Sequence, residues 1–564
     1  MLRARQPGSR RAGHVIMMAM KTAFNALPLV IGVVGHRDVP RKAEAPLRKQ
    51  FAATLAKLQQ EHPFTPLLVL TALAAGADML AAEEAVERGV AVMACLPVSA
   101  ERYEQDFSPA ERIRFTKILQ KCSSVSIAGN SDNVEDGYVA ATSYIAYYSQ
   151  ILIAFWDGKP GRGPGGTSHA VAMRTMGISN VQRSAIVPYV GDIGPVYHLV
   201  TPREGQPRPS DAFTMREIHP RRFSSDHRGE RDFRAAVGRL DTYNRDIQRS
   251  AQSHIESLTD LMKTTDEAAN RLQRESVRFM RFVYTFGFVA GAAQIVELGP
   301  AGVAIKAGLL FVAFAFFAFA RKNDYENRYQ DYRALAEGLR VQQAWRCAGL
   351  RDRVVDESYL RMQQSELQWI RLALRAAALV FGGRRIETAE SPHHPECLEW
   401  IRGQWRYYYA AARREAKRDR LYKRVMVAAT ALGIALSGAA GTALMVTGGI
   451  QLGPLSWHGT PIAWVAVHNQ LVTYLATVPM ALAGLMALLI RSFSEHEAYG
   501  ENARRYQRMF VVFDFALRRL HKIRNRGYAG DAAAVIGELG HEALTEHADW
   551  LILHRERPLS VVHG

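Results

Sequence analysis

The sequence predicts an α/β N-terminal domain with a parallel sheet, followed by an all-α membrane region with four transmembrane helices and long cytosolic helices. In the first 200 residues, continuous apolar runs alternate with amphipathic stretches, which is typical of a parallel sheet covered by helices on both faces. Farther along, residues 425–490 contain no Lys, Arg, Asp or Glu, which is enough for two membrane spans and a loop between them.

The elements of the α/β domain follow from its apolar runs. Helical patterns such as residues 45–60 and 77–89 separate these runs. Six runs predict the strands, at 29–36, 67–71, 90–97, 123–127, 151–156 and 196–200. Because ligands of such sheets bind at the carboxyl ends of the strands, we expect the functional residues in the loops that follow them.

The distribution of charge distinguishes a membrane partner from a nucleic acid. The chain has a net charge of +17, yet residues 28–200 hold 16 basic and 16 acidic side chains. A nucleic-acid-binding protein usually concentrates its positive charge on the globular domain, whereas here most of it lies beside apolar segments after residue 200. We therefore expect a lipid bilayer as partner and no nucleic acid. The four cysteines lack metal-ligand spacing, so we expect reduced thiols and no metal site.

Two pairs of apolar segments predict the membrane spans. They lie at about 282–299 and 302–320, and at about 425–447 and 470–490. The flanking residues are basic: Arg278, Arg281, Arg321, Lys322, seven positions within 413–424, and Arg491. By the positive-inside rule, the N-terminal domain and both termini face the cytosol of a multi-pass protein in a bacterial inner membrane. The alternative for each pair is a buried hairpin of a soluble protein.

The two halves of this region are similar to each other. Each has a long polar helix, two spans and another polar helix, and Arg-Tyr-Gln occurs at 328–330 and at 505–507. We interpret this as a divergent internal duplication. Small residues at Gly433, Ser437 and Gly441 favour close helix packing, and a homo-oligomer is expected.

These observations predict a division of the chain into seven parts. They are a basic disordered tail (1–27), the α/β domain (28–200), a linker that partly wraps it (201–235), a first two-span module (236–350), a helical connector (351–395), a second two-span module (396–530) and a C-terminal tail (531–564).

Two loops at strand ends carry candidate ligand-binding residues. The first, GVVGHRD (32–38), offers Gly35 for a close backbone approach, and His36 and Arg37 to meet a phosphate or a base. An ordinary tight turn with an exposed arginine is the alternative. The second, TALAAGAD (71–78), contains Gly76 and Asp78. Asp78 is either a helix N-cap or an acceptor of hydrogen bonds from a ribose.

A third loop, GRGPGGTSHAV (161–171), contains Gly163, Gly165, Gly166 and Thr167 between a strand and a helix. Such a loop directs backbone N–H groups at a phosphate. No Asp or Glu occurs between Asp157 and Asp192, so the site either binds without cleavage or takes its acid from elsewhere in the fold. His169 is a general acid or base, or a side chain satisfied by a local hydrogen bond.

The motifs GVVGHRD, TALAAGAD, ACLP followed by ERYEQDF, and AFWDGKPGRGPGGTSHAV resemble the SLOG superfamily over residues 28–200. This superfamily includes the Lonely-guy phosphoribohydrolases and the DNA-processing protein A family. The resemblance implies a Rossmann-like fold and adds Pro97 and Trp156 to the expected ligand-binding residues. The membrane half resembles the SLATT modules, two-span units that accompany SLOG domains in bacterial conflict systems.

The resemblance implies a sensor of a nucleotide second messenger, coupled to a pore-forming or membrane-disrupting effector in antiphage or conflict defence. We expect no cofactor, a nucleotide-derived ligand and no catalytic residue. In the Lonely-guy hydrolases the loop has the form P-G-G-x-G-T-x-x-E with a catalytic Glu, whereas this chain has Ala170 and Val171 where that acid would lie. The alternatives are a membrane-anchored nucleotide N-glycosidase and a scaffold with a vestigial site.

Overall fold

The computed structural model describes most of the chain. The described residues are 16–17, 25–128, 134–161, 163–176, 194–219, 228–250, 255–295, 299–350, 355, 359, 367–382, 395–448, 450–452, 455–457, 469–526 and 529–555. The chain divides into two compact units. Unit 1 comprises residues 1–268 and 331–391, and unit 2 comprises residues 269–330 and 392–564.

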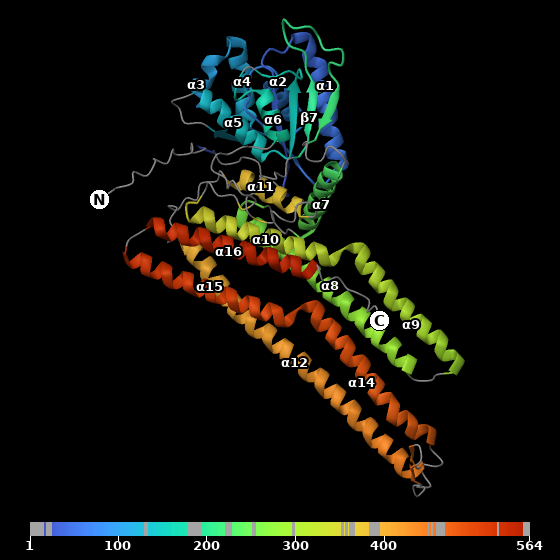
Figure 1. Ribbon diagram of the computed structural model, residues 1–564. Coiled ribbons are helices and arrows are strands. Elements are labelled where there is room, and N and C mark those ends of the chain that lie inside the picture. Colours follow the sequence, from blue (N-terminus) through green and yellow to red (C-terminus); the bar gives the residue numbers. More distant parts are fainter. Residues whose placement is uncertain are drawn as a thin grey trace. The chain divides into compact units, whose positions relative to one another are not determined.

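Unit 1 is built on an eight-stranded sheet with the order β1-β5-β4-β3-β2-β6-β7-β8 (Figure 1). The strands are β1 (Ile16–Met17), β2 (Leu29–Gly35), β3 (Leu67–Thr71), β4 (Ala91–Leu96), β5 (Ser124–Ile127), β6 (Ile151–Trp156), β7 (Val196–Val200) and β8 (Met215–Ile218). The six strands β2 to β7 are parallel, and the two edge strands are antiparallel to their neighbours. All six predicted strands are therefore confirmed, and the mostly parallel α/β architecture with them.

The two edge strands were not predicted. β1 lies within the tail that was expected to be disordered, and β8 lies within the predicted linker 201–235. β1 is a two-residue strand within a short apolar stretch of that tail. β8 has no apolar run, because an antiparallel edge strand needs only one buried face and its sequence is more polar. It consists of Met-Arg-Glu-Ile with no fully buried residue.

Helices connect the strands and cover the sheet. They are α1 (Arg41–Glu61), α2 (Ala77–Glu87), α3 (Ala100–Tyr103), the 3₁₀ turn η1 (Glu104–Asp106), α4 (Pro109–Lys121), α5 (Val134–Tyr148) and α6 (Thr167–Met176). The start of α4 is encoded locally, because Ser108 and Glu111 form a capping box around Pro109. α2 packs on both α1 and α4, and α5 packs on α6. Right-handed crossovers place these two groups on opposite faces of the sheet.

Three further helices belong to unit 1: α7 (Arg228–Ser250), the main part of α10 (Tyr325–Cys347) and α11 (Gln368–Gly382). Asn244 on α7 exchanges two hydrogen bonds with the backbone of Leu27, just before β2. The predicted boundaries at 200, 235 and 350 therefore differ from those of the compact unit. Sequence composition gave no sign that helices distant in the chain would pack on the α/β domain.

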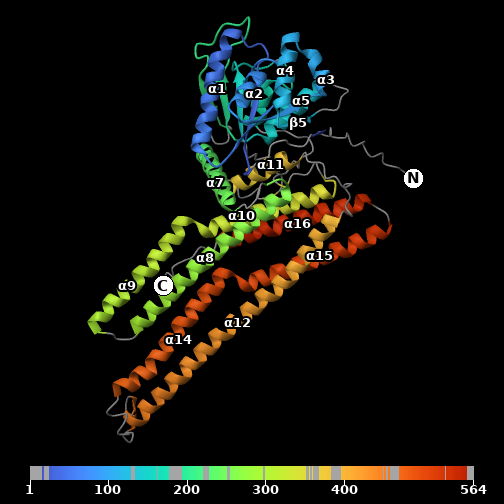
Figure 2. The same cartoon turned by 180° about the vertical axis from the view of Figure 1, so that it is seen from behind.

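Unit 2 is all-helical apart from a short strand pair, β9 (Ile450–Leu452) and β10 (Leu455–Trp457), among its described residues. Its helices are most of α8 (Leu258–Ile295), α9 (Gly299–Asn323), α12 (Pro395–Gly448), α14 (Asn469–Glu497), α15 (Tyr499–Arg526) and α16 (Ala529–Arg555). Figure 2 shows α12 and α14 running side by side. A Cβ atom on Gly433 would lie 2.5 Å from that of Ala483, so this glycine permits the close approach.

Among the described residues, two helical segments are long and apolar enough to cross a membrane, not four. They are Gly302–Cys347 and Thr477–Asn525, and they contain the predicted span 302–320 and most of the span 470–490. The most apolar window of each is only 6% buried within the protein. The predicted spans 282–299 and 425–447 fall on α8 and α12 but are not among these two segments, and residues 296–298 lie outside the described residues.

Candidate functional site

The candidate site lies where the order of the strands reverses. The chain moves from β2 outward to β5 and then returns to place β6 on the other side of β2. Gly35, the last residue of β2, pairs with Phe155 near the end of β6. In open α/β sheets, the carboxyl ends of strands at such a switch point form a crevice in which ligands bind. The loops after β2, β3 and β6 are therefore brought to the same edge, as predicted.

Two glycines let the first two loops pack backbone against backbone. Gly76 has φ = +81°, and a Cβ atom there would lie 2.3 Å from the carbonyl oxygen of Arg37. A Cβ atom on Gly35 would lie 2.4 Å from that of Ala77. The N–H of Ala77 donates to the carbonyl of His36 over 3.0 Å. Any larger residue at either position would force the loops apart.

His36 is held as a neutral acceptor by the loop after β6. Its Nε2 accepts a 3.0 Å hydrogen bond from the backbone N–H of Asp157 and lies 3.2 Å from the Oδ1 of that residue. Burial lowers the pKa of His36 and outweighs the opposing effect of the Asp157 carboxylate. Because its Nε2 lone pair is used, His36 locks the β2 and β6 loops together at this atom.

Sequence reasoning missed the ion pairs that surround this histidine. Arg203 makes a bidentate pair with Asp38, with a shortest distance of 2.8 Å, and lies 3.8 Å from Asp157. Hydrogen bonding to Arg203 lowers the pKa of Asp38 despite the opposing effect of partial burial. Arg203 falls in the predicted linker, where only its proximity to a strand end could have drawn attention to it. Asp157 thus donates its backbone N–H to His36, while its carboxylate lies beside Arg203.

Arg37 is exposed and positioned by an aromatic ring. Its guanidinium carbon lies 5.0 Å from the centre of the Tyr138 ring, at the start of α5. The Tyr138 hydroxyl donates a 2.7 Å hydrogen bond to Asp106. A Cβ atom on Gly165 would lie only 3.0–3.1 Å from Tyr138 and the backbone after it. Tyr138 therefore contacts Arg37 through its ring and packs against the glycine-rich loop through its Cβ and backbone.

The glycine-rich loop leads directly into α6. Gly165 has φ = +82°, and its carbonyl accepts a 2.6 Å hydrogen bond from Thr142. Gly163 and Gly166 have open space around them, and Thr167 is the first residue of α6. The first N–H groups of a helix lack intrahelical partners and carry a partial positive charge, and the first turn of α6 holds no acid. The predicted turn from a strand into a helix is thus present, and phosphate binding by this loop stays a prediction.

His169 is held by a hydrogen bond within this loop. Its Nδ1 accepts a 2.9 Å hydrogen bond from the backbone N–H of Gly165. The expectation that this histidine is satisfied locally is therefore confirmed.

Asp78 is buried beneath the loops, with only 3% of its surface exposed. It is not the N-cap of α2, because Gly76 occupies that position. Its Oδ2 accepts a hydrogen bond from Thr71 over 3.1 Å, and its Oδ1 has no hydrogen-bond partner among the described residues. Burial raises its pKa to about 7. The N-cap interpretation is wrong, and the ribose interpretation stays a prediction.

Pro97 and Trp156 have structural contacts. Pro97 is buried, and a Cβ atom on Gly137 would lie 2.5 Å from its carbonyl oxygen, so the turn after β4 fixes the first part of α5. The Trp156 indole donates a 2.8 Å hydrogen bond to the carbonyl of Lys159, and its ring lies 5.0 Å from that of His198 on β7. Trp156 closes the turn after β6.

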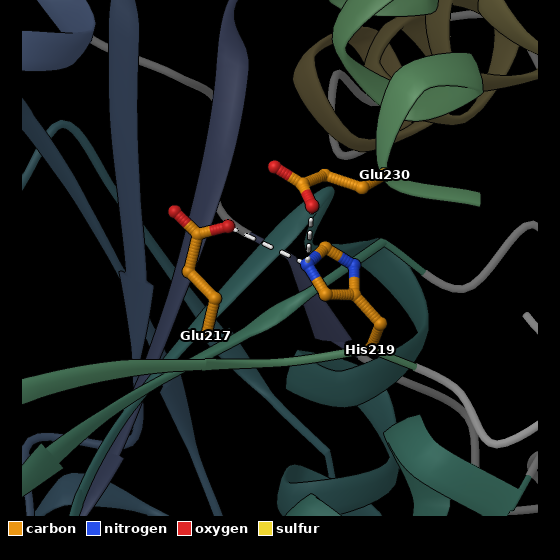
Figure 3. Close-up of side chains that lie close together, drawn as sticks. All are labelled: Glu217, His219 and Glu230. Atoms are coloured by element: carbon orange, nitrogen blue, oxygen red, sulfur yellow. Dashed lines mark ion pairs between the residues drawn. The ribbon is translucent and has the colours of Figure 1, made fainter. Parts of the chain in front are cut away.

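A second polar cluster lies between β8 and α7 (Figure 3). The Nε2 of His219 is 3.4 Å from Glu217 and 4.0 Å from Glu230, and the three ligand atoms are close enough to hold a metal. However, Arg234 pairs with both glutamates, at 3.8 and 2.6 Å. Because a cation already pairs with both acids, we interpret the cluster as an ion-pair network that joins α7 to the edge of the sheet.

Comparison with known proteins gives little further guidance. No protein-family model matches the chain, and a search of curated proteins finds no match. Part of the chain is similar to the X-ray structure of DNA processing protein A from Streptococcus pneumoniae, with 17% identity over 30% of this chain and a TM-score of 0.22. The matched part spans about half of that protein, 50% of its length. A likeness at this level carries no argument about function.

Proposed function

We propose that this protein senses a nucleotide-derived anion in a SLOG-like, Rossmann-like domain and transmits binding to a SLATT-like membrane effector. The effector would form a pore or disrupt the bacterial inner membrane during antiphage or conflict defence. In this proposal the protein is a homo-oligomer with four spans, and its N-terminal domain and both termini lie in the cytosol. The observation that carries the proposal is the convergence of Arg37 and the Gly163–Thr167 loop at one switch point.

An anionic ligand suits the charges at this point. The start of α6 offers partly positive N–H groups, and the exposed guanidinium of Arg37 supplies a full positive charge beside them. The acids nearby are already paired with arginines: Asp157 lies 3.8 Å from Arg203, and Asp106 lies 3.4 Å from Arg102 and accepts from Tyr138. A phosphate can therefore approach without meeting an unpaired carboxylate among these groups.

Hydrogen bonds within unit 1 support coupling of the sheet to its helices. Gln150, just before β6, accepts a 2.6 Å bond from the N–H of Val30 on β2 and donates to the carbonyl of Leu372 on α11. Trp369 on α11 donates to Asp331 on α10 over 2.9 Å. A shift of the sheet would thus reach α10 through buried contacts.

Two helices continue from unit 1 into unit 2. α8 enters unit 2 at residue 269, and α10 begins in unit 2 and enters unit 1 at residue 331. Within unit 1 they are joined by ion pairs of Asp266 on α8 with Arg333 and Arg340 on α10, each at 2.9 Å. The covalent paths between the units therefore include helical segments, which transmit displacement better than a flexible linker.

Binding without turnover is favoured over the N-glycosidase alternative. His169 uses Nδ1 to hold the loop, and the Asp157 carboxylate lies 3.8 Å from Arg203. Neither is a free general acid or base for cleavage of a glycosidic bond. Release of free base from a nucleotide by the purified protein would reinstate the enzyme.

The test is dye leakage from liposomes containing the full chain, challenged with AMP, ADP-ribose and cyclic dinucleotides, beside direct binding of each. Gly166→Asp is the decisive variant. Position 166 has open space and precedes α6, so the new carboxylate caps the helix and occupies the N–H groups that a phosphate would need. We expect binding to weaken by at least about tenfold with no loss of thermal stability.

Arg37→Ala is expected to weaken binding by about 10- to 100-fold, the contribution of a charge-assisted hydrogen bond. The matched controls are Gly238→Asp, which adds the same charge at another open glycine, and Lys57→Ala, which removes an exposed cation from α1. Equal affinities in the parent protein and both site variants would place any bound nucleotide elsewhere. Binding without leakage would leave a membrane-anchored sensor.

A further inference from the structure

Both helical segments that are long and apolar enough to cross a membrane contain a break. At each break a residue other than glycine has a positive φ. α9 ends at Asn323, Asp324 has φ = +50°, and α10 begins at Tyr325. α14 ends at Glu497, Ala498 has φ = +52°, and α15 begins at the next residue. A left-handed conformation is uncommon for residues other than glycine. Figures 1 and 2 show that the chain changes direction at both places.

The residue after each break stacks on the preceding helix of the same half. The ring of Tyr325 is parallel to that of Phe279 on α8, with centroids 5.5 Å apart and planes 10° apart. The ring of Tyr499 is parallel to that of Tyr422 on α12, with centroids 5.4 Å apart and planes 6° apart. A stacked aromatic pair is thus the second feature that the two breaks share, with its partner ring on α8 in the first half and on α12 in the second.

A third feature also repeats at the same spacing. Arg328, four residues after the first break, donates a side-chain hydrogen bond to the carbonyl of Asn323 over 3.2 Å. Asn502, four residues after the second break, donates to the carbonyl of Glu497 over 3.1 Å. Each side chain therefore caps the residue that precedes the break. The breaks align residue 324 with residue 498, whereas the two Arg-Tyr-Gln sequences would align residue 328 with residue 505. The two alignments of the halves therefore differ by three positions.

We propose that Asp324 and Ala498 are equivalent joints of a repeated helical module, each latched by its stacked aromatic pair and its capped carbonyl. Opening a latch changes the angle between an apolar helix and the polar helix after it, while both helices stay folded. The positive φ, the stacked rings and the capped carbonyl occur together at both breaks, although the two segments are far apart in the sequence. An accidental kink does not explain this repetition. The proposal does not depend on the ligand, because it concerns the protein's own contacts.

The test is a distance measurement across the second joint in the full chain in lipid nanodiscs. Spin labels are attached at Met480→Cys on α14 and Val511→Cys on α15, whose native side chains are 58% and 59% exposed. An unbroken helix would separate these positions by about 46 Å, from a rise of about 1.5 Å for each residue. We expect a shorter distance with a narrow distribution. The protein without introduced cysteines is the labelling control, since its four cysteines are buried.

Tyr499→Ala removes the stacked ring and is expected to broaden the distribution, whereas Tyr499→Phe keeps the ring and the parent distance. A parent distance near 46 Å, or an unchanged distribution in Tyr499→Ala, overturns the proposal. If Tyr499→Ala does not fold, two substitutions of Ala498 test the proposal by the same distance measurement. Ala498→Gly should keep the short distance, because glycine adopts positive φ freely, and the β-branched Ala498→Val should lengthen it. Equal distances in these two variants also overturn the proposal.

Discussion

The α/β part of unit 1 and the helices of unit 2 bury their apolar side chains to very different extents. In β2, Leu29, Val30 and Ile31 have no exposed surface. On α9 of unit 2, Leu310, Phe311 and Phe314 are 58%, 71% and 66% exposed. Contiguous exposed apolar surface marks contact with a membrane or another protein. Similar apolar sequence thus serves two environments, and the difference appears only when burial is known.

Unit 1 also uses its buried polar groups to hold one packed arrangement. Buried side chains from one element repeatedly bond the backbone of another: Gln150 joins β2 to α11, and Asn244 joins α7 to the residue before β2. Such bonds form only when all the elements are in place. Single substitutions can therefore probe the contrast between a packed unit and exposed apolar helices, and the largest effect is expected in the packed unit.

Removing Arg174 should destabilise unit 1 strongly. This arginine on α6 is 2% exposed and donates to the carbonyls of Ala146, Ser149 and Gln150 over 2.9–3.1 Å. Arg174→Met keeps an apolar stem but leaves three buried carbonyls without these donors, which costs about 5 kcal/mol. Hydrogen exchange of the β2 and β6 amides measures the loss.

Arg88→Met is the matched control. Arg88 is 41% exposed and pairs with Glu84 at the surface, so its loss should cost less than about 1 kcal/mol. If the β2 and β6 amides are equally protected in the two variants, the buried hydrogen bonds do not stabilise the sheet as we argue.

Asp78 is a buried acid of unit 1, and it should make stability depend on pH. Its folded pKa of about 7 lies above the ordinary value of 3.8, so the folded state holds a proton that the unfolded state releases. The free energy of unfolding should therefore fall as pH rises from about 4 to about 7, by up to about 4 kcal/mol. Asp78→Asn keeps an acceptor for Thr71 and cannot ionise.

Urea unfolding at pH 4 and pH 8 measures this dependence. The variant should match the parent protein at pH 4 and exceed it at pH 8. Glu101→Gln, which alters an exposed carboxylate, should reproduce the parent protein at both values. An Asp78→Asn variant that is no more stable at pH 8 would show that the buried carboxylate is compensated in the folded state.

The sequence predicted what local and periodic patterns encode. The six central strands are apolar runs in the sequence, and the glycine-rich loop before α6 indicates a turn from a strand into a helix. The edge strand β8 was missed because a strand with one buried face has no such run. The packing of α10 and α11 in unit 1 was missed because it depends on particular contacts, such as Trp369 with Asp331, that no composition reveals.

The candidate site shows the same limit. Gly35, Gly76 and Gly165 were recognisable because each must permit a close backbone approach. Tyr138 and Arg203, which position Arg37 and Asp38, were not recognisable. Their roles arise where chain segments far apart in the sequence meet at the switch point.

A single charge introduced on α9 is expected to change the free energy least of the three substitutions. It tests most directly whether the exposed apolar side chains of unit 2 contact lipid. Phe314→Asp places an acid near the middle of the segment 302–320. In a bilayer this disfavours insertion of the helix by about 3 kcal/mol, whereas on a water-exposed helix the change would be harmless or would improve solubility. We expect less full-length protein in carbonate-washed membranes.

Ile113→Asp, at a position 60% exposed on α4, is the control and should leave the amount of full-length protein in these membranes unchanged. If Phe314→Asp also leaves it unchanged, the apolar face of α9 contacts another protein surface rather than lipid, since burial within the chain does not account for it.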